Sequence, residues 1–248
     1  AAAGIRILHE AGVPADVLHL LPGDGATVGA ALVADPRIDG VCFTGSTEVA
    51  RLINRQLATR TDRIPVLVAE TGGVNAMIVD STALPEQVTR DVLISAFQSA
   101  GQRCSALRLL YLQTDVADRM LAMIEGAMDE LTVGDPALLA TDIGPVIDDE
   151  AKALLDAHKK RRLGEARLIK ALEPGPGTGR GSFVAPAAFE LTDPGQLERE
   201  VFGPILHVVR YKAEELERVV EQINATGYGL TLGIHTRIDE TRQRIGAR

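Results

Sequence analysis

One cysteine in the chain stands in a setting that suits covalent chemistry. Cys104 follows a segment, residues 88–100, whose apolar residues recur at helical spacing, and Gly101 is the expected helix end. An apolar run typical of a strand, residues 107–113, comes next. A thiol held on such a tight connection has few rotamers and can act as a nucleophile once it is deprotonated. The alternative is a small buried apolar residue, which is what most free cysteines are.

A carboxylate and two glycines follow another expected strand, residues 65–69. Glu70 comes at its carboxyl end, where open α/β sheets bind their ligands, and Thr71, Gly72 and Gly73 come next. Glu70 can therefore be a general base, or it can be a solvated carboxylate at a strand end. The paired glycines allow another group to approach the backbone closely.

Two glycine-bearing turns could hold phosphate groups. Gly45 and Ser46 lead directly into an expected helix, whose first N–H groups and dipole favour an anion, although Ser46 can simply cap that helix. Gly23, Gly25 and Gly29 give G-x-G-x-x-x-G, which is one residue longer than the dinucleotide fingerprint and matches it poorly.

Composition excludes several functional classes. The 248 residues carry a net charge of −8 and only 3% aromatic residues, so the chain offers no basic or stacking surface for nucleic acid. No apolar run is long enough to span a membrane, and no signal peptide is visible. Two distant cysteines and five scattered histidines predict neither a disulfide framework nor a metal site, and the cytoplasm is the expected compartment.

The elements that must position these residues alternate along the chain. Strands are expected at 17–21, 40–43, 65–69, 75–79, 107–113, 183–191, 205–211 and 230–235. Helices are expected at 1–12, 27–34, 47–60, 85–100, 115–131, 149–161 and 213–225. Such alternation predicts an α/β fold with parallel sheets. Because the pattern restarts after the paired glycines, we expect two domains, residues 1–72 and 73–248. The single mid-strand cysteine, Cys42, is expected in the core, and both chain ends look cut rather than finished.

Four motifs occur together in one order and spacing. They are Phe43-Thr44-Gly45-Ser46-Thr47, Glu70-Thr71-Gly72-Gly73, Gly101-Gln102-Arg103-Cys104 and Glu200-Val201-Phe202-Gly203-Pro204. In this the chain resembles the aldehyde dehydrogenase superfamily over essentially its whole length. The residues in and around the second and third motifs are similar to those of the glutamate-semialdehyde (Δ1-pyrroline-5-carboxylate) dehydrogenase module of bacterial proline utilization A. The resemblance implies a Rossmann-like NAD-binding part followed by an α/β catalytic domain.

The resemblance also implies residue roles. Cys104 would be the nucleophile and Glu70 the general base, in NAD-dependent oxidation of L-glutamate γ-semialdehyde through a thiohemiacetal and a thioester. Arg103 and Ser105 would bind the substrate, although Arg103 can equally form a structural ion pair. The cofactor would be held by eight residues: Gly23, Gly25, Gly45, Ser46, Thr71, Gly72, Glu200 and Phe202. FAD would be needed only if a proline dehydrogenase domain belonged to the same protein.

The resemblance further places an oxyanion-hole Asn, a ribose-binding Lys, a carboxylate-binding loop and an oligomerisation hairpin outside these 248 residues. Activity is therefore expected of a homo-oligomeric full-length protein, and the segment alone is expected to be nearly inactive. Val74 stands where the family usually has a polar residue, and Ala50 stands where many relatives have glycine. Two alternatives stay open: oxidation of another small aldehyde such as succinate semialdehyde, and a non-catalytic remnant.

Overall fold

The computed structural model describes residues 1–248, which divide into two compact units, Ala1–Thr71 and Gly72–Arg248. This division lies one residue before the boundary that the sequence suggests. No helix in either unit combines the length and the apolar character that a membrane crossing requires.

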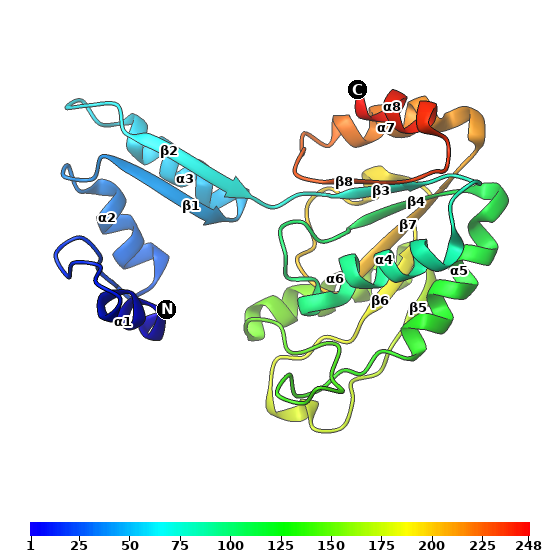
Figure 1. The fold of residues 1–248 in the computed structure, drawn as a ribbon, viewed down its shortest axis with the longest axis horizontal. Helices are drawn as coiled ribbons and strands as arrows, with labels where there is room; N and C mark the ends of the chain where they lie inside the picture. Colours follow the sequence, from blue (N-terminus) through cyan, green and yellow to red (C-terminus); the bar gives the residue numbers. More distant parts are fainter. The chain divides into compact units, whose positions relative to one another are not determined.

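The first unit contains one parallel pair of strands and its helices (Figure 1). Its elements are α1 (Ala2–Glu10), a π-helical turn (Gly25–Gly29), α2 (Ala30–Ala34), β1 (Gly40–Gly45), α3 (Thr47–Ala58) and β2 (Val66–Thr71). Register pairs Thr44 with Glu70 and Gly45 with Thr71. The two carboxyl ends of the strands therefore meet at one edge, with the start of α3 directly after it.

Two expectations for the first unit are wrong. The apolar run at residues 17–21 forms no strand, and Val17 and Leu21 are exposed. A strand needs a neighbour for its backbone groups, and β1 and β2 pair only with each other. Cys42 is exposed rather than buried, because the side chains of β1 alternate and Cys42 lies on its less covered face.

The second unit is built on a six-stranded sheet with the strand order β5-β6-β7-β4-β3-β8. The strands are β3 (Ala76–Val79), β4 (Leu109–Gln113), β5 (Arg167–Ala171), β6 (Ala187–Glu190), β7 (Ile205–Tyr211) and β8 (Leu232–His235). Every pairing is parallel except the edge pair β5–β6. The predicted parallel α/β class is thus confirmed. The sequence analysis did not predict β5, whose charged residues Arg167 and Lys170 are typical of an edge strand.

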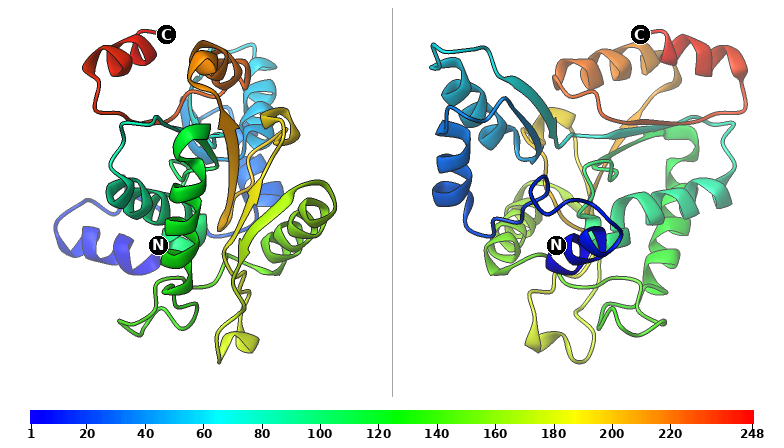
Figure 2. Two further views of the ribbon diagram at one scale, coloured as in Figure 1. Left: turned by 90° about the vertical axis from the view of Figure 1, so that its right-hand side faces the viewer. Right: turned by 60° about the vertical axis from the view of Figure 1, so that its left-hand side comes forward.

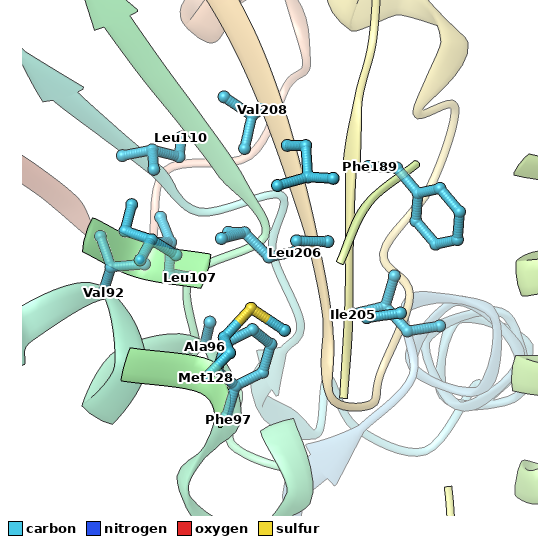
Figure 3. Packing of buried hydrophobic residues seen from close by; sticks show 14 of the residues in the cluster. Val92, Ala96, Phe97, Leu107, Leu110, Met128, Phe189, Ile205, Leu206 and Val208 are labelled. Carbon is cyan, nitrogen blue, oxygen red and sulfur yellow. The ribbon is translucent and has the colours of Figure 1, made fainter. Parts of the chain in front are cut away.

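Helices cover both faces of this sheet. They are α4 (Pro85–Phe97), α5 (Thr114–Asp129), α6 (Asp149–Glu165), α7 (Leu216–Ala225) and α8 (Asp239–Gly246). In the left view of Figure 2, α6 lies on the other side of the strands from α4 and α5. The cluster beneath α4 and α5 includes Phe97, Leu110 and Leu206, and Figure 3 shows these side chains packed together. A second cluster joins α7 and α8 to the opposite face through residues such as Tyr111 and Val219.

The helix before the cysteine motif ends earlier than expected. α4 stops at Phe97, and a 3₁₀ segment, Gln98–Gly101, follows it. Ser99, Ala100 and Gly101 all have positive φ values of 58°, 53° and 64°. Ala96 and Ala100 are both buried, so the apolar spacing continues through a backbone that is no longer a right-handed helix. Periodicity alone cannot reveal that change.

Candidate active site

The candidate nucleophile lies on a turn that a buried side chain holds in place. Cys104 and Ser105 form an exposed turn between the 3₁₀ segment and β4. The Asn75 side-chain amide donates hydrogen bonds to the carbonyl oxygens of Cys104 at 2.7 Å and Ala106 at 2.9 Å. Its oxygen accepts the Thr231 N–H at 3.2 Å. The position of the turn is therefore tied to β3 and to the segment that leads into β8.

Backbone strain lies immediately before this turn. Left-handed φ values cost a non-glycine residue roughly 1 kcal/mol or more, and both Ser99 and Ala100 adopt them. At Gly101 a side chain would also overlap the carbonyl oxygen of Gly203. The cysteine motif and the Glu200–Pro204 motif, about a hundred residues apart in sequence, thus approach each other backbone to backbone.

Arg108 connects these same two motifs. Its side chain is fully buried and donates to the carbonyl oxygens of Gly101 at 2.7 Å, Arg103 at 3.1 Å and Gly203 at 3.1 Å. It also forms an ion pair with Glu200, with Nη2 at 3.0 Å from Oε1. Burial lowers the pKa of Arg108, whereas the charges of Glu200 and Cys104 raise it. An arginine keeps its charge under such shifts, so the pair remains ionic at neutral pH.

Glu200 and Phe202 present groups that could receive a cofactor. Glu200 Oε1 is held by Arg108, and a Cβ at Gly72 would overlap Oε2. The bare backbone of Gly72 therefore makes room for the carboxylate. The ring of Phe202 is 44% exposed and has the Arg108 guanidinium carbon 5.3 Å from its centroid. Arg108 bonds only Oε1 of Glu200, and Phe202 is exposed, so Oε2 and this ring could meet a ligand with hydroxyl groups and a planar ring.

The two candidate substrate residues beside Cys104 differ in their surroundings. The guanidinium of Arg103 donates to the Ile94 carbonyl oxygen at 2.8 Å and to Gln98 Oε1 at 3.2 Å. These partners belong to α4 and its end, and no carboxylate pairs with Arg103. Ser105 is exposed, and its carbonyl oxygen accepts a hydrogen bond from the Thr231 hydroxyl at 3.4 Å.

In the first unit, four candidate residues gather at one sheet edge. Gly45 and Thr71 are register partners at the ends of β1 and β2, and Glu70 is an exposed residue one step before Thr71. Ser46 follows Gly45 and caps α3, where its hydroxyl accepts the Val49 N–H at 3.2 Å. The cap interpretation of Ser46 is therefore correct, and the first backbone N–H groups of α3 stand at the same edge. Gly25 begins the π-helical turn that leads into α2, and Gly23 lies two residues before that turn starts.

A pair of histidines, His207 and His158, holds the backbone carbonyl of Arg108. His207 on β7 is fully buried, and its Nδ1 lies 3.1 Å from the Arg108 carbonyl oxygen, to which it must donate. Its Nε2 then accepts from His158 Nε2 of α6 at 2.9 Å. Burial lowers the pKa of His207 to about 3 and that of His158 to about 4, so both rings are neutral near pH 7. No cluster of three or more His, Cys, Asp or Glu side chains is arranged to hold a metal ion.

The sequence reading missed Arg108, Asn75 and His207. A signal was present for Arg108, because a lone arginine inside an apolar strand must find partners for a buried charge. His207 carries a similar signal as a polar residue within the apolar run of β7, whereas Asn75 carries none, because the groups that its amide donates to are backbone carbonyls from a distant part of the sequence.

Comparison with known proteins gives consistent matches. The model of the aldehyde dehydrogenase family matches residues 1–248. Bifunctional protein PutA of Escherichia coli (strain K12) is 58% identical over 254 residues, which cover 99% of this chain and 19% of that protein. The 1-pyrroline-5-carboxylate dehydrogenase of Geobacillus kaustophilus is 36% identical over 238 residues, covering 94% and 45% respectively.

Solved structures agree with these matches. A crystal structure of bifunctional proline utilization A (PutA) gives a TM-score of 0.96 at 60% identity and covers all of this chain and 25% of that one. The 1-pyrroline-5-carboxylate dehydrogenase from Thermus with bound NAD gives 0.89 at 35% identity, covering 98% and 47%. The chain therefore spans about a fifth of the PutA relatives and somewhat under half of the shorter ones. Because the family model matches along the entire length, the chain belongs to the aldehyde dehydrogenase family.

Proposed function

We propose that the full-length protein carrying this chain oxidises L-glutamate γ-semialdehyde to L-glutamate, the second step of proline degradation. The observation that carries the proposal is the end-to-end similarity to PutA and to 1-pyrroline-5-carboxylate dehydrogenases, at 58% and 36% identity. The exposed Cys104, held on its turn by Asn75, supports it because the chemistry requires an accessible and oriented thiol.

Cys104 performs the covalent step in this proposal. Its thiolate adds to the aldehyde carbon, a C–S bond forms, and the carbonyl oxygen becomes an oxyanion that the Cys104 backbone N–H can stabilise. A nicotinamide cofactor held by Glu200 and Phe202 would supply the acceptor for the hydride of that carbon, so that Cys104 would then carry a thioester. Glu70 then takes a proton from the water that cleaves the C–S bond and releases the carboxylate product.

Members of the family use NAD or NADP, and we propose NAD for this chain, as in the Thermus relative solved with bound NAD. Glu200 Oε2 would accept hydrogen bonds from ribose hydroxyls, and the exposed Phe202 would pack against the same end of the cofactor; the Arg108–Glu200 ion pair and the exposure of Phe202 support these roles. Thr71 and Gly72 would approach the nicotinamide through backbone atoms. Gly45 and Ser46, at the start of α3, would hold the pyrophosphate, and Gly23 and Gly25 would line the adenosine side.

The two units take separate roles under this proposal. Residues 1–72 are the end of the NAD-binding domain, and residues 73–248 are most of the catalytic domain. Ser105 and Arg103 bind the substrate, and the contacts of Arg103 with α4 support an additional role in shaping the turn. The protein would act in the cytoplasm as a homo-oligomer, with FAD present only if a proline dehydrogenase domain accompanies this one.

The test is NADH formation by the purified full-length protein with a panel of aldehydes. Glutamate semialdehyde is expected to give the highest kcat/KM, and NAD to be preferred over NADP. Faster turnover of succinate semialdehyde would keep the chemistry and reject the substrate. No turnover with any aldehyde would support a non-catalytic remnant.

A further inference from the structure

Every donor of the Arg108 guanidinium is used, and all its partners belong to the candidate site. An arginine side chain has five N–H donors, and the structure gives Arg108 five hydrogen bonds. Two go to the cysteine motif, at the carbonyls of Gly101 and Arg103. The other three go to the Glu200–Pro204 motif, one at the Gly203 carbonyl and two at Glu200 Oε1, from Nη2 at 3.0 Å and Nε at 3.3 Å.

We propose that Arg108 is a positioning residue that sets the Cys104 turn and the Glu200 carboxylate relative to each other. The inference rests on the proposed function, because it assigns Glu200 to the cofactor and Cys104 to the substrate. The guanidinium group is planar and its N–H donors point in fixed directions. It therefore holds the cysteine motif and the Glu200–Pro204 motif at one fixed separation and orientation. A shift of either motif would break at least two of these hydrogen bonds.

Hydrogen bonds also hold the backbone of Arg108, so its guanidinium group extends from a fixed position. Its N–H donates to the Asn75 carbonyl at 3.0 Å. Its carbonyl oxygen accepts both the His207 N–H at 3.0 Å and the His207 ring Nδ1–H at 3.1 Å. Arg108 thus stands between β3 and β7, and Asn75 binds the Cys104 turn directly as well. Two side chains therefore hold the Cys104 turn from this part of the sheet. Arg108 binds the carbonyls of Gly101 and Arg103, and Asn75 binds that of Cys104.

Another arginine of the chain provides a matched control. Arg162 on α6 is also almost fully buried, and it pairs with Glu165 at 3.2 Å and donates to the Gln196 carbonyl at 2.8 Å. None of these partners belongs to the candidate site. Arg162→Lys shows how far NAD binding and kcat change when a buried arginine is altered away from the site. Any larger change in Arg108→Lys then reports the positioning role.

The experiment uses the full-length protein with Arg108→Lys, Arg162→Lys and no substitution. Lysine keeps the charge but has three donors on a flexible stem, so it cannot hold both motifs. For Arg108→Lys we expect the Kd of NAD to rise about tenfold, as for a lost charge-assisted hydrogen bond. We expect kcat to fall on the order of 10²-fold, as for a misplaced reacting group. Arg162→Lys is expected to leave both unchanged.

A second readout needs no substrate. Both cysteines of the chain are exposed, so iodoacetamide labelling of Cys104 can be measured against Cys42 in the same molecule. The ratio of Cys104 to Cys42 labelling is expected to fall about threefold or more in Arg108→Lys, because the carbonyls of Gly101 and Arg103 lose the donors that hold the turn presenting the thiol. If the ratio and the Kd of NAD match those of Arg162→Lys, Arg108 is structural only and the proposal is wrong.

A double variant and readouts that need no turnover provide two further tests of the role of Arg108. If Arg108→Lys does not fold, Arg108→Met combined with Glu200→Met removes the buried pair together, which is often tolerated. Cys104 labelling in that double variant is expected to fall below that in Glu200→Met alone, and equal labelling would overturn the proposal. If the protein oxidises no semialdehyde, the proposed function fails, but the labelling ratio and NAD binding still decide the role of Arg108.

Discussion

The side-chain amide of Asn75 donates a hydrogen bond to the carbonyl oxygen of Cys104 at 2.7 Å, from the residue directly before β3 to the candidate nucleophile. The same amide nitrogen binds Ala106, so one buried side chain spans both sides of the exposed turn. A thiol on a surface turn is thereby held by a buried residue directly before β3.

Substitution of Asn75 by alanine is expected to destabilise the protein and to slow catalysis. It leaves the carbonyls of Cys104 and Ala106 without their donor, and each unsatisfied buried group costs about 1–3 kcal/mol. Thermal unfolding and kcat of the full-length protein measure the two effects. The control is Asn224→Ala, whose amide makes one exposed hydrogen bond and should matter little. Equal effects of the two substitutions would contradict the role given to Asn75.

Gly72→Ala is expected to weaken NAD binding more than it weakens folding. The new methyl group would occupy the place of Glu200 Oε2, so the carboxylate must move away from Arg108. Isothermal titration with NAD should show an affinity about tenfold lower, the value of one charge-assisted hydrogen bond. Gly164→Ala, on α6 with open space around it, is the control and should bind NAD normally. Normal NAD binding by Gly72→Ala would show that Glu200 does not serve the cofactor.

Gly101→Ala is expected to disrupt the Cys104 turn. The residue has φ +64°, and its side chain would meet the Gly203 carbonyl, so strain and overlap add to each other. Loss of soluble protein or a Tm several degrees lower is expected. Gly126→Ala inside α5 has open space and should instead stabilise the protein by about 0.5–1 kcal/mol. A Gly101→Ala protein with unchanged Tm and activity would refute the close backbone approach.

Stability is expected to fall in acid through the buried histidine pair. Burial holds the pKa of His207 at about 3 and of His158 at about 4, whereas unfolded histidine has a pKa near 6.5. Above pH 6.5 both states are neutral and the pair adds no pH dependence. As the pH falls from 6.5 toward 4, only the unfolded chain takes up these protons, so the free energy of unfolding decreases.

Urea unfolding of the full-length protein between pH 7 and 4 measures this slope. His207→Gln cannot titrate there and should flatten it, by at most about 1.4 kcal/mol per pH unit for one proton. Asn224→Ala, which removes no titratable group, should leave the slope unchanged. A slope that is identical in all three proteins would exclude the histidine pair as its source.

The sequence predicted well whatever depends on local pattern. β7 runs from Ile205 to Tyr211 as expected, because a continuous apolar run specifies a buried parallel strand. Sequence patterns failed to predict the structure where a tertiary contact determines the backbone conformation. Ala100 continues the apolar spacing of α4 but has φ 53°, because its segment must turn toward the carbonyl of Gly203.

The candidate site divides in the same way. Glu200 could be singled out from a motif and Arg108 as a lone charge in an apolar run. Their pairing could not be predicted, because it spans 92 residues and requires the order of β4 and β7 in the sheet. Polar side chains that serve backbone carbonyls, such as Asn75, leave no pattern in the sequence at all. Sequence therefore indicates which groups react, and the fold supplies the groups that hold them.

The most direct test of the account is NADH formation from glutamate semialdehyde by the full-length protein with Cys104→Ala, compared with Cys42→Ala. Both cysteines are exposed, so the pair controls for the loss of a surface thiol. The account predicts no NADH above the enzyme-free rate for Cys104→Ala and an unchanged rate for Cys42→Ala. NADH formation by Cys104→Ala at the unsubstituted rate would contradict the covalent mechanism, and with it the role assigned to every residue that positions this turn.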